Sequence, residues 1–174
     1  MNREAKHYLV IDGYNLIQAA PELFQKMATL ENRREHLLKL LISTPQIKKS
    51  RVTVVFDGKS PVGKPAKYNI QGIGVIFSGD QQEADQIIQQ IIRTRASSQK
   101  LVIISSDHEI VNTARDHHAQ SQTAREFWQK IRKKSISPKQ RQKSALTTQS
   151  ELSDREVQEW LNIFQRKQPS DDET

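Results

Sequence analysis

The stretch that decides the fold is YLVIDGYN, residues 8–15. Its first four residues have the length and apolar character of a short buried strand, and the Asp-Gly pair that follows ends that strand. Two later apolar runs have the same form, and the three runs end in Asp12, Asp57 and Asp107. In an open parallel α/β sheet, the carboxyl ends of the strands meet at one edge, and ligands bind in the crevice beside it. The three aspartates are therefore predicted to converge.

A fourth aspartate is predicted at the same edge from a helical pattern. The apolar stripe of this helix consists of Ala84, Ile87, Ile88, Ile91 and Ile92. Asp85 lies three residues before Ile88 and seven before Ile92, so it shares the sheet-facing side, and its place in the first turn directs it toward the edge. At roughly 5 Å and an effective dielectric constant near 20, each pair of carboxylates repels by about 3 kcal/mol. A hard divalent cation, Mg²⁺ or Mn²⁺, removes this conflict, and such ions commonly act on phosphate groups.

Three of these four aspartates also have a purely structural interpretation. Asp12 and Asp57 precede glycines and suit ordinary turns, and Asp107 suits the N-cap of the helix that follows it. Asp80 and Glu83 have the spacing of a capping box at the start of a helix. The spacing alone does not separate caps from ligands, and both interpretations stay open at this point.

The order of patterns along the chain is strand, helix, strand, loop, strand, helix, strand, helix, which predicts an α/β fold with a central parallel sheet and crossover helices. Residues 58–72, rich in Gly, Pro and Lys, are predicted to be a loop, and residues 74–77 the third strand. Thr123 and Glu126 predict the start of a further helix. The expected organisation is an α/β domain over 1–134, a basic flexible linker over 135–152, an amphipathic helix over 153–167 and a disordered tail over 168–174.

The 174 residues suit one domain with an appendage. The chain contains no cysteine, which excludes disulfides and zinc sites built on thiolates and agrees with a reducing compartment. No signal-peptide pattern precedes Asp12, and no stretch approaches the roughly 20 apolar residues that span a bilayer. We therefore expect a soluble, cytoplasmic protein without a membrane partner.

The formal net charge of +7 is placed unevenly. Residues 130–143 contain no acid and seven basic residues: Lys130, Arg132, Lys133, Lys134, Lys139, Arg141 and Lys143. This local charge predicts a polyanionic partner, and the scarcity of large apolar residues in the segment favours nucleic acid over a membrane surface. The alternative is a solvated linker.

Further candidate binding residues lie in the loop after Asp57. Lys59, Lys64 and Lys67 could hold phosphates, and Tyr68 could stack on a base, although a merely solvated loop is the alternative. Three histidines match no common zinc spacing and suit exposed helix ends: His108, His117 and His118.

Together these motifs resemble the NYN family of PIN-like nucleases, most closely its bacterial YacP-like branch. The resemblance rests on residues 10–17, 54–57, 75–78, 84–85, 105–107 and 123–127. It implies a PIN-like Rossmannoid three-layer sandwich, a divalent metal held by acids, and ribonuclease activity. It also suggests a bacterial source, and members of the YacP-like branch are linked to mRNA cleavage on ribosomes.

Carried over by position, the resemblance implies that Asp12, Asp85 and Asp107 hold metal and that Asp57 is a further member of the acidic set. Asn15 would orient a ligand or a water molecule. Glu83 stands where relatives tend to carry a small hydroxyl residue, so it is either a cap or a fifth carboxylate. Substrate-binding residues are expected among the basic side chains of the last matching segment and its extension: Arg125, Lys130, Arg132, Lys133 and Lys134.

These observations lead to the hypothesis of an endoribonuclease that depends on Mg²⁺ or Mn²⁺. No residue is an obvious proton-transfer base, so activation of water falls to one or two metal ions. The alternatives are a non-catalytic RNA- or ribosome-binding module and a small-molecule phosphatase or nucleotidase that uses the same crevice. The basic segment favours a polynucleotide, since a nucleotide-sized substrate needs no seven positive charges.

Overall fold

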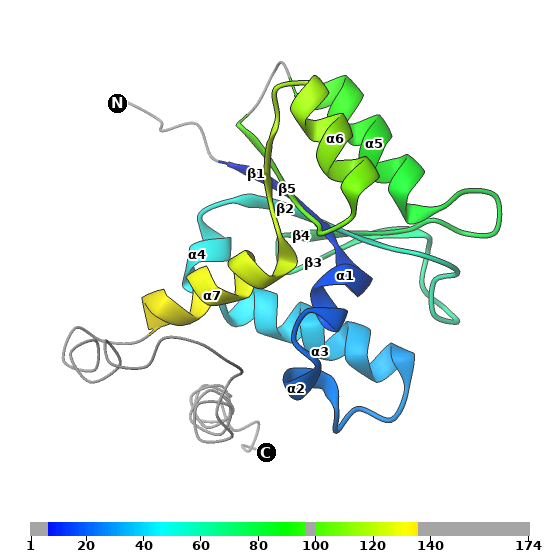
Figure 1. Ribbon diagram of the computed structural model, residues 1–174. Coiled ribbons are helices and arrows are strands. Elements are labelled where there is room, and N and C mark those ends of the chain that lie inside the picture. Colours follow the sequence, from blue (N-terminus) through cyan, green and yellow to red (C-terminus); the bar gives the residue numbers. More distant parts are fainter. Residues whose placement is uncertain (1–6, 97–99, 136–174) are drawn as a thin grey trace. The chain divides into compact units, whose positions relative to one another are not determined.

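The structure, a computed structural model, describes residues 7–96 and 100–135 (Figure 1). Its centre is a six-stranded sheet with the strand order β3-β4-β2-β1-β5-β6. The strands are β1 (Tyr8–Asp12), β2 (Arg51–Phe56), β3 (Lys67–Ile70), β4 (Ile73–Phe77), β5 (Leu101–Ile104) and β6 (Gln120–Gln122). Neighbouring strands run parallel except β3 and β4, which are antiparallel.

Helices cover both faces of this sheet. They are α1 (Gly13–Gln18), α2 (Pro21–Phe24), α3 (Leu30–Ser43), α4 (Pro45–Lys48), α5 (Ala84–Arg95), α6 (His108–Asp116) and α7 (Ala124–Ser135). Helices α5 and α6 lie on one side of the sheet, and α1, α3 and α7 lie on the other (Figure 1). The predicted three-layer α/β architecture is confirmed.

Burial on both faces explains the continuous apolar runs of the central strands. On one face, Val10 and Ile103 pack with Ile88 and Ile92 of α5, and all four side chains are fully buried. On the other face, the indole of Trp128 in α7 donates a hydrogen bond from Nε1 to the carbonyl of Leu16 at 2.8 Å, so its polar group is satisfied inside the core.

Two strands differ from the sequence prediction. The predicted loop 58–72 contains β3, an edge strand that pairs antiparallel with β4, and this part of the loop prediction was wrong. Only alternate residues of β3 are half-buried, so the strand carries a weak apolar signal between Gly- and Pro-rich flanks. The other missed strand, β6, has the polar sequence QSQ and depends on pairing with β5 instead of on burial.

One predicted capping box is confirmed and one is wrong. Thr123 and Glu126 exchange hydrogen bonds at the start of α7, with Thr123 N to Glu126 Oε2 at 2.9 Å and Glu126 N to Thr123 Oγ1 at 3.2 Å. Helix α5 begins only at Ala84, so its N-cap is Glu83, which forms a capping box with Gln86. Residues 80–82 form a bend before the helix, and Asp80 is ion-paired to Lys59 at 2.7 Å.

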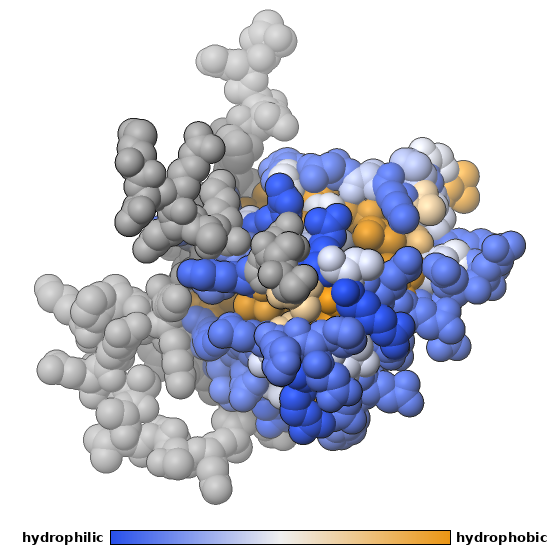
Figure 2. Space-filling view, turned by 90° about the horizontal axis from the view of Figure 1, so that it is seen from above, coloured by the Kyte–Doolittle hydropathy of each residue, from blue (hydrophilic) through white to orange (hydrophobic). Residues whose placement is uncertain are grey.

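Hydrophilic side chains cover most of the face in Figure 2, with hydrophobic patches between them. Within the described residues, no helix is long and apolar enough to cross a membrane. The predicted linker beyond Ser135, the helix over 153–167 and the tail over 168–174 lie outside the described residues, as do Lys139, Arg141 and Lys143.

Substitution of Gly13 tests how tightly the turn after β1 is packed. A Cβ atom at this position would lie 2.3 Å from Cε1 of Phe56, whose ring is fully buried. We expect Gly13→Ala to lower the free energy of unfolding by about 1–3 kcal/mol, the usual effect of overpacking. Denaturant titration measures this. The control is Gly63→Ala, where the added methyl group meets nothing and only the positive φ of 81° is strained. Wild-type stability of Gly13→Ala would show that Phe56 moves aside without cost.

Candidate functional site

The order in which successive strands are added to the sheet reverses between β1 and β5. Strand β1 has β2 on one side and β5 on the other, so the connections that follow β1 and β5 leave toward opposite faces. An open pocket of about 320 Å³ lies at the carboxyl ends of these strands. It is lined by Asp12, Tyr14, Asn15, Gln18, Asp57, Glu83, Ala84, Asp85 and Asp107. The structure therefore brings the four predicted aspartates and Asn15 together.

Asp12 is the buried member of this acidic pocket, with 9% of its surface exposed. Its Oδ1 accepts the backbone N–H of Asn15 at 3.1 Å, and its Oδ2 accepts the hydroxyl of Ser105 at 3.3 Å. Burial raises the pKa of Asp12, and the negative charge of Asp107 raises it further, while these hydrogen bonds act in the opposite direction.

Ser105 and Asn15 tie the ends of β1 and β5 together. The fully buried hydroxyl of Ser105 donates to Asp12 and accepts the backbone N–H of Asp107 at 3.1 Å. The side-chain oxygen of Asn15 accepts the backbone N–H of Ser106 at 2.9 Å. A single serine thus connects two of the site aspartates, and Asn15 holds the two turns at a fixed separation.

Asp107 and Asp57 have structural roles as well as a place in the pocket. Oδ1 of Asp107 caps α6 by accepting the backbone N–H groups of Glu109 and Ile110 at 2.8 and 3.2 Å. Oδ1 of Asp57 accepts the hydroxyl of Ser78 at 2.9 Å and the backbone N–H of Ala84 at 3.2 Å, which fixes the start of α5. The turn and cap interpretations are therefore correct for these residues without excluding a ligand role.

Asp85 differs from the other three aspartates. It is half-buried in the first turn of α5, and no hydrogen-bond donor among the described residues reaches its carboxylate. Burial is the main cause that raises the pKa of Asp85, followed by the negative charges of Asp107, Asp12, Glu83 and Asp57. Glu83 both caps α5 and lines the pocket, so the pocket contains five carboxylates.

The donor set suits a hard cation. In the ranges 7–96 and 100–135, no three Asp, Glu or His side chains already form a group tight enough to hold an ion, so binding would have to draw them closer. Both oxygens of Asp85 and the Oδ2 atoms of Asp57 and Asp107 accept no hydrogen bond from the described part of the chain. Unpaired carboxylate oxygens of this kind are the ligands that Mg²⁺ and Mn²⁺ prefer.

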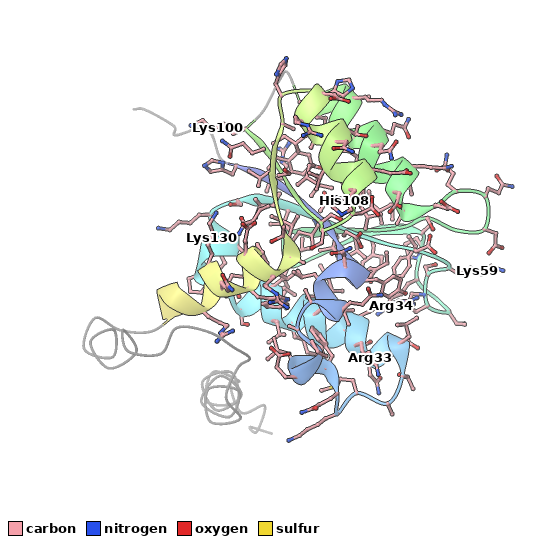
Figure 3. All side chains as sticks on the ribbon, viewed as in Figure 1. Arg33, Arg34, Lys59, Lys100, His108 and Lys130 are labelled. Atoms are coloured by element: carbon pink, nitrogen blue, oxygen red, sulfur yellow. The ribbon has the colours of Figure 1, made fainter. Side chains whose placement is uncertain are left out.

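The basic residues predicted in the loop lie outside this pocket lining. Lys59 projects from its loop and is paired with Asp80 (Figure 3). Lys64 lies 3.7 Å from Glu35 and above the ring of Tyr68, which in turn stacks on Phe77. Lys67 begins β3 and is exposed. A substrate-binding role for these residues stays a prediction.

The predicted basic residues of α7 do not line the acidic pocket either. Arg125 is exposed, and Arg132 is half-buried. Lys130 donates to Oε1 of Gln122 at 3.1 Å and lines a separate hollow beside β6. The side chains of Lys133 and Lys134 lie outside the described part of the structure. The three histidines at the ends of α6 are exposed, in agreement with the sequence interpretation: His108, His117 and His118.

Sequence reasoning gave no role to Ser78, Ser105, Tyr14 and Arg34. The two serines directly follow β4 and β5, and a polar residue at a strand end is the signal that could have identified them. Tyr14 lines the pocket, and its hydroxyl accepts a hydrogen bond from Nε of Arg34 at 2.5 Å. No sequence pattern marks Arg34, because it is one of several charged residues on α3.

The two roles of Asp107 can be separated by substitution. Asp107→Ala removes the cap of α6 and should lower the free energy of unfolding by about 1 kcal/mol. Asp107→Asn keeps a capping oxygen and removes one negative charge from the pocket, so its stability should equal or exceed that of the wild type. Denaturant titration of both variants in chelator measures this. Equal losses in both would mean that the carboxylate charge, not the cap, stabilises the fold.

The absence of donors at Asp85 leads to a second prediction. Asp85→Asn should raise the free energy of unfolding in chelator by about 0.5 kcal/mol, a value kept small because the group is partly solvated. Added Mn²⁺ should stabilise the wild type more than this variant. Thermal unfolding with and without Mn²⁺ measures both effects. Asp80→Asn, outside the pocket, is the control that should keep the wild-type response, and an unchanged response in Asp85→Asn would remove Asp85 from the ligand set.

Comparisons with known proteins agree with this geometry. Residues 9–166 match the YacP-like NYN domain family. The uncharacterized protein YacP of Bacillus subtilis (strain 168) is 32% identical over 84 residues, which cover 48% of this chain and 49% of that protein. The chain thus spans about half the length of this curated relative.

Two solved structures share the fold. The crystal structure of Rae1 (YacP) from Bacillus subtilis has a TM-score of 0.56 at 23% identity, and the match covers 92% of this chain and 95% of that one. The crystal structure of a mutant of the same protein has a TM-score of 0.56 at 20% identity, covering 91% of both chains. Since the family match extends over most of the sequence, the chain belongs to the YacP-like NYN domain family.

Proposed function

We propose that the protein is a divalent-metal-dependent endoribonuclease that hydrolyses RNA phosphodiester bonds. The observation that carries this proposal is the acidic pocket, where Asp12, Asp57, Asp85 and Asp107 meet at the switch point of the sheet. NYN domains are nuclease-type domains, which supports a role in RNA cleavage. The four aspartates are the proposed metal ligands.

A bound Mg²⁺ or Mn²⁺ ion would supply charge neutralisation at the phosphate and activation of the attacking water. The chain supplies positioning. Hydrogen bonds from Asn15 and Ser105 fix the buried carboxylate of Asp12, whereas Asp57 is exposed and keeps the pocket open to a long substrate. The side-chain amide of Asn15 has its oxygen engaged by Ser106, so its N–H groups are placed to donate to a phosphate oxygen or to the attacking water.

The proposal includes mRNA on the ribosome as the substrate and the cytoplasm as the location. The substrate follows from the resemblance to the YacP-like branch, and the location agrees with a chain that contains no cysteine. The net charge of +7 supports a polyanionic partner, and the basic residues between Lys130 and Lys143 are the proposed contacts to its backbone.

Substitution of the pocket acids tests the activity. Asp12→Asn and Asp107→Asn should each lower the rate of Mn²⁺-dependent cleavage of a labelled RNA by at least about 100-fold, because each removes a proposed ligand to the activating ion. Asp80→Asn is the matched control, since this exposed aspartate pairs with Lys59 outside the pocket. Gel analysis of the RNA products with Mn²⁺, with Mg²⁺ and in chelator measures the rates.

Four results would contradict the proposal. Wild-type rates in either pocket variant, or undiminished cleavage in chelator, would exclude the metal mechanism. Tight RNA binding without cleavage would favour a non-catalytic binding module. Release of phosphate from mononucleotides while RNA stays intact would favour a nucleotidase.

A further inference from the structure

A cluster of aromatic rings beside the acidic pocket holds one arginine. Phe56 and Phe77 end β2 and β4, and their rings stack with centroids 5.4 Å apart. The ring of Tyr14 packs against Phe56 at 5.5 Å. The guanidinium carbon of Arg34 lies 5.3, 5.9 and 5.2 Å from the ring centroids of Tyr14, Phe56 and Phe77, so one cation lies over three rings.

Arg34 has no acidic partner within the part of the chain that the structure describes. Its Nε donates to the hydroxyl of Tyr14, and the described ion pairs, Lys59 with Asp80 and Lys64 with Glu35, do not include it. The side chain is half-buried. Aromatic rings can position a guanidinium group, but they do not neutralise its positive charge as a carboxylate would.

Arg34 and its neighbour Arg33 make different contacts. Arg33 also belongs to α3, but its Nε donates to the backbone carbonyl of Met27 at 3.2 Å. In Figure 3, Arg34 lies between α3 and the sheet, whereas Arg33 lies farther from the sheet. Arg34 is thus directed toward the acidic edge, and Arg33 stabilises the turn before α3.

The two sides of the site are directly connected. Tyr14 lines the acidic pocket and also accepts the hydrogen bond of Arg34, so a single side chain separates the guanidinium from the pocket. Asp57 follows Phe56 in sequence, and its negative charge contributes to raising the pKa of Tyr14. A phosphate strand that enters a pocket of five carboxylates is repelled by them, and a fixed cation at the rim offsets this repulsion.

We propose that Arg34 binds a backbone phosphate of the RNA strand next to the acidic pocket, with the Tyr14 hydroxyl as a second donor to the same phosphate. The proposal rests on the proposed function for the identity of the strand. The fork of N–H groups beyond Nε suits bidentate contact with phosphate oxygens. The Tyr14 oxygen already accepts from Arg34, which leaves its own proton to donate.

The alternative is that Arg34 only covers the aromatic cluster. In that case its removal would expose the edges of Phe56 and Phe77, lower stability and leave RNA affinity unchanged once the protein is folded. Stability and affinity therefore have to be measured separately, in the same variants.

Binding is tested with a single-stranded 2′-O-methyl RNA, which resists cleavage, by fluorescence anisotropy in chelator. Arg34→Gln should weaken binding about tenfold, the usual result of losing one charge-assisted hydrogen-bonded contact. It should also make the log-log salt slope shallower by about 0.7. Arg33→Gln, the matched control, should change neither quantity. Arg34→Lys keeps the charge without the planar fork and should fall between wild type and Arg34→Gln.

A modified oligonucleotide locates the contact. In a set of RNA strands, each strand carries one neutral methylphosphonate at a different position. At one position, the methylphosphonate should weaken binding by the wild type but should not weaken binding by Arg34→Gln any further. Thermal unfolding of every variant identifies those that fold. If folded Arg34→Gln or Arg34→Lys binds like Arg33→Gln, and no methylphosphonate position depends on Arg34, the inference is overturned.

These experiments distinguish a failure of the Arg34 phosphate site from a failure of the proposed nuclease function. Cleavage by the wild type with Arg34-independent binding would retain the nuclease and exclude the phosphate site. Arg34-dependent binding without cleavage by any variant would retain the phosphate site and exclude the nuclease.

Discussion

The hydrogen bonds around the buried carboxylate of Asp12 are the constraint on which the rest of the site depends. A carboxylate inside the protein is unfavourable unless donors surround it, and Asn15 and Ser105 supply them from the turns after β1 and β5. The same hydroxyl of Ser105 accepts from Asp107. The hydrogen bonds that offset the burial of Asp12 therefore also fix the turn that positions Asp107.

This arrangement gives the acids two functions at once. One oxygen of Asp57 and one of Asp107 hold the starts of α5 and α6, and the other oxygen of each is left in the pocket. Rigid helices thus position the free oxygens without any residue dedicated to that purpose. The side chain of Asp85 makes no hydrogen bond within the described fold, and burial with four neighbouring carboxylates raises its pKa. The position of this carboxylate is not explained by the stability of the chain, and the proposed metal would account for it.

The features that were predicted correctly depend on hydrophobic periodicity and on the residues that follow the strands. The buried strands, the helices and the convergence of Asp12, Asp57, Asp85 and Asp107 followed from apolar runs that end in an acid and from one helical stripe. Strand β3 was missed because an edge strand needs only one apolar face, and β6 because its pairing with β5 is made by the backbone. The start of α5 was misplaced because Asp80 has the spacing of a cap but is paired with Lys59, a contact made in three dimensions. Arg34 was missed for a related reason. Its three rings come from α1, β2 and β4, which only the folded sheet brings together.

The two sides of the site follow one electrostatic principle. If a carboxylate were paired with Arg34, the pair would be satisfied within the protein and would offer little charge to a ligand. Aromatic rings instead orient the guanidinium and leave its charge available, just as the unpaired oxygens of Asp85 leave negative charge in the pocket. A direct ion pair between these charges would cancel both, and Tyr14 lies between them as a neutral spacer. A ligand that presents a divalent cation to the acids and a phosphate to the arginine satisfies both sides. A metal-bound polynucleotide has this combination of charges.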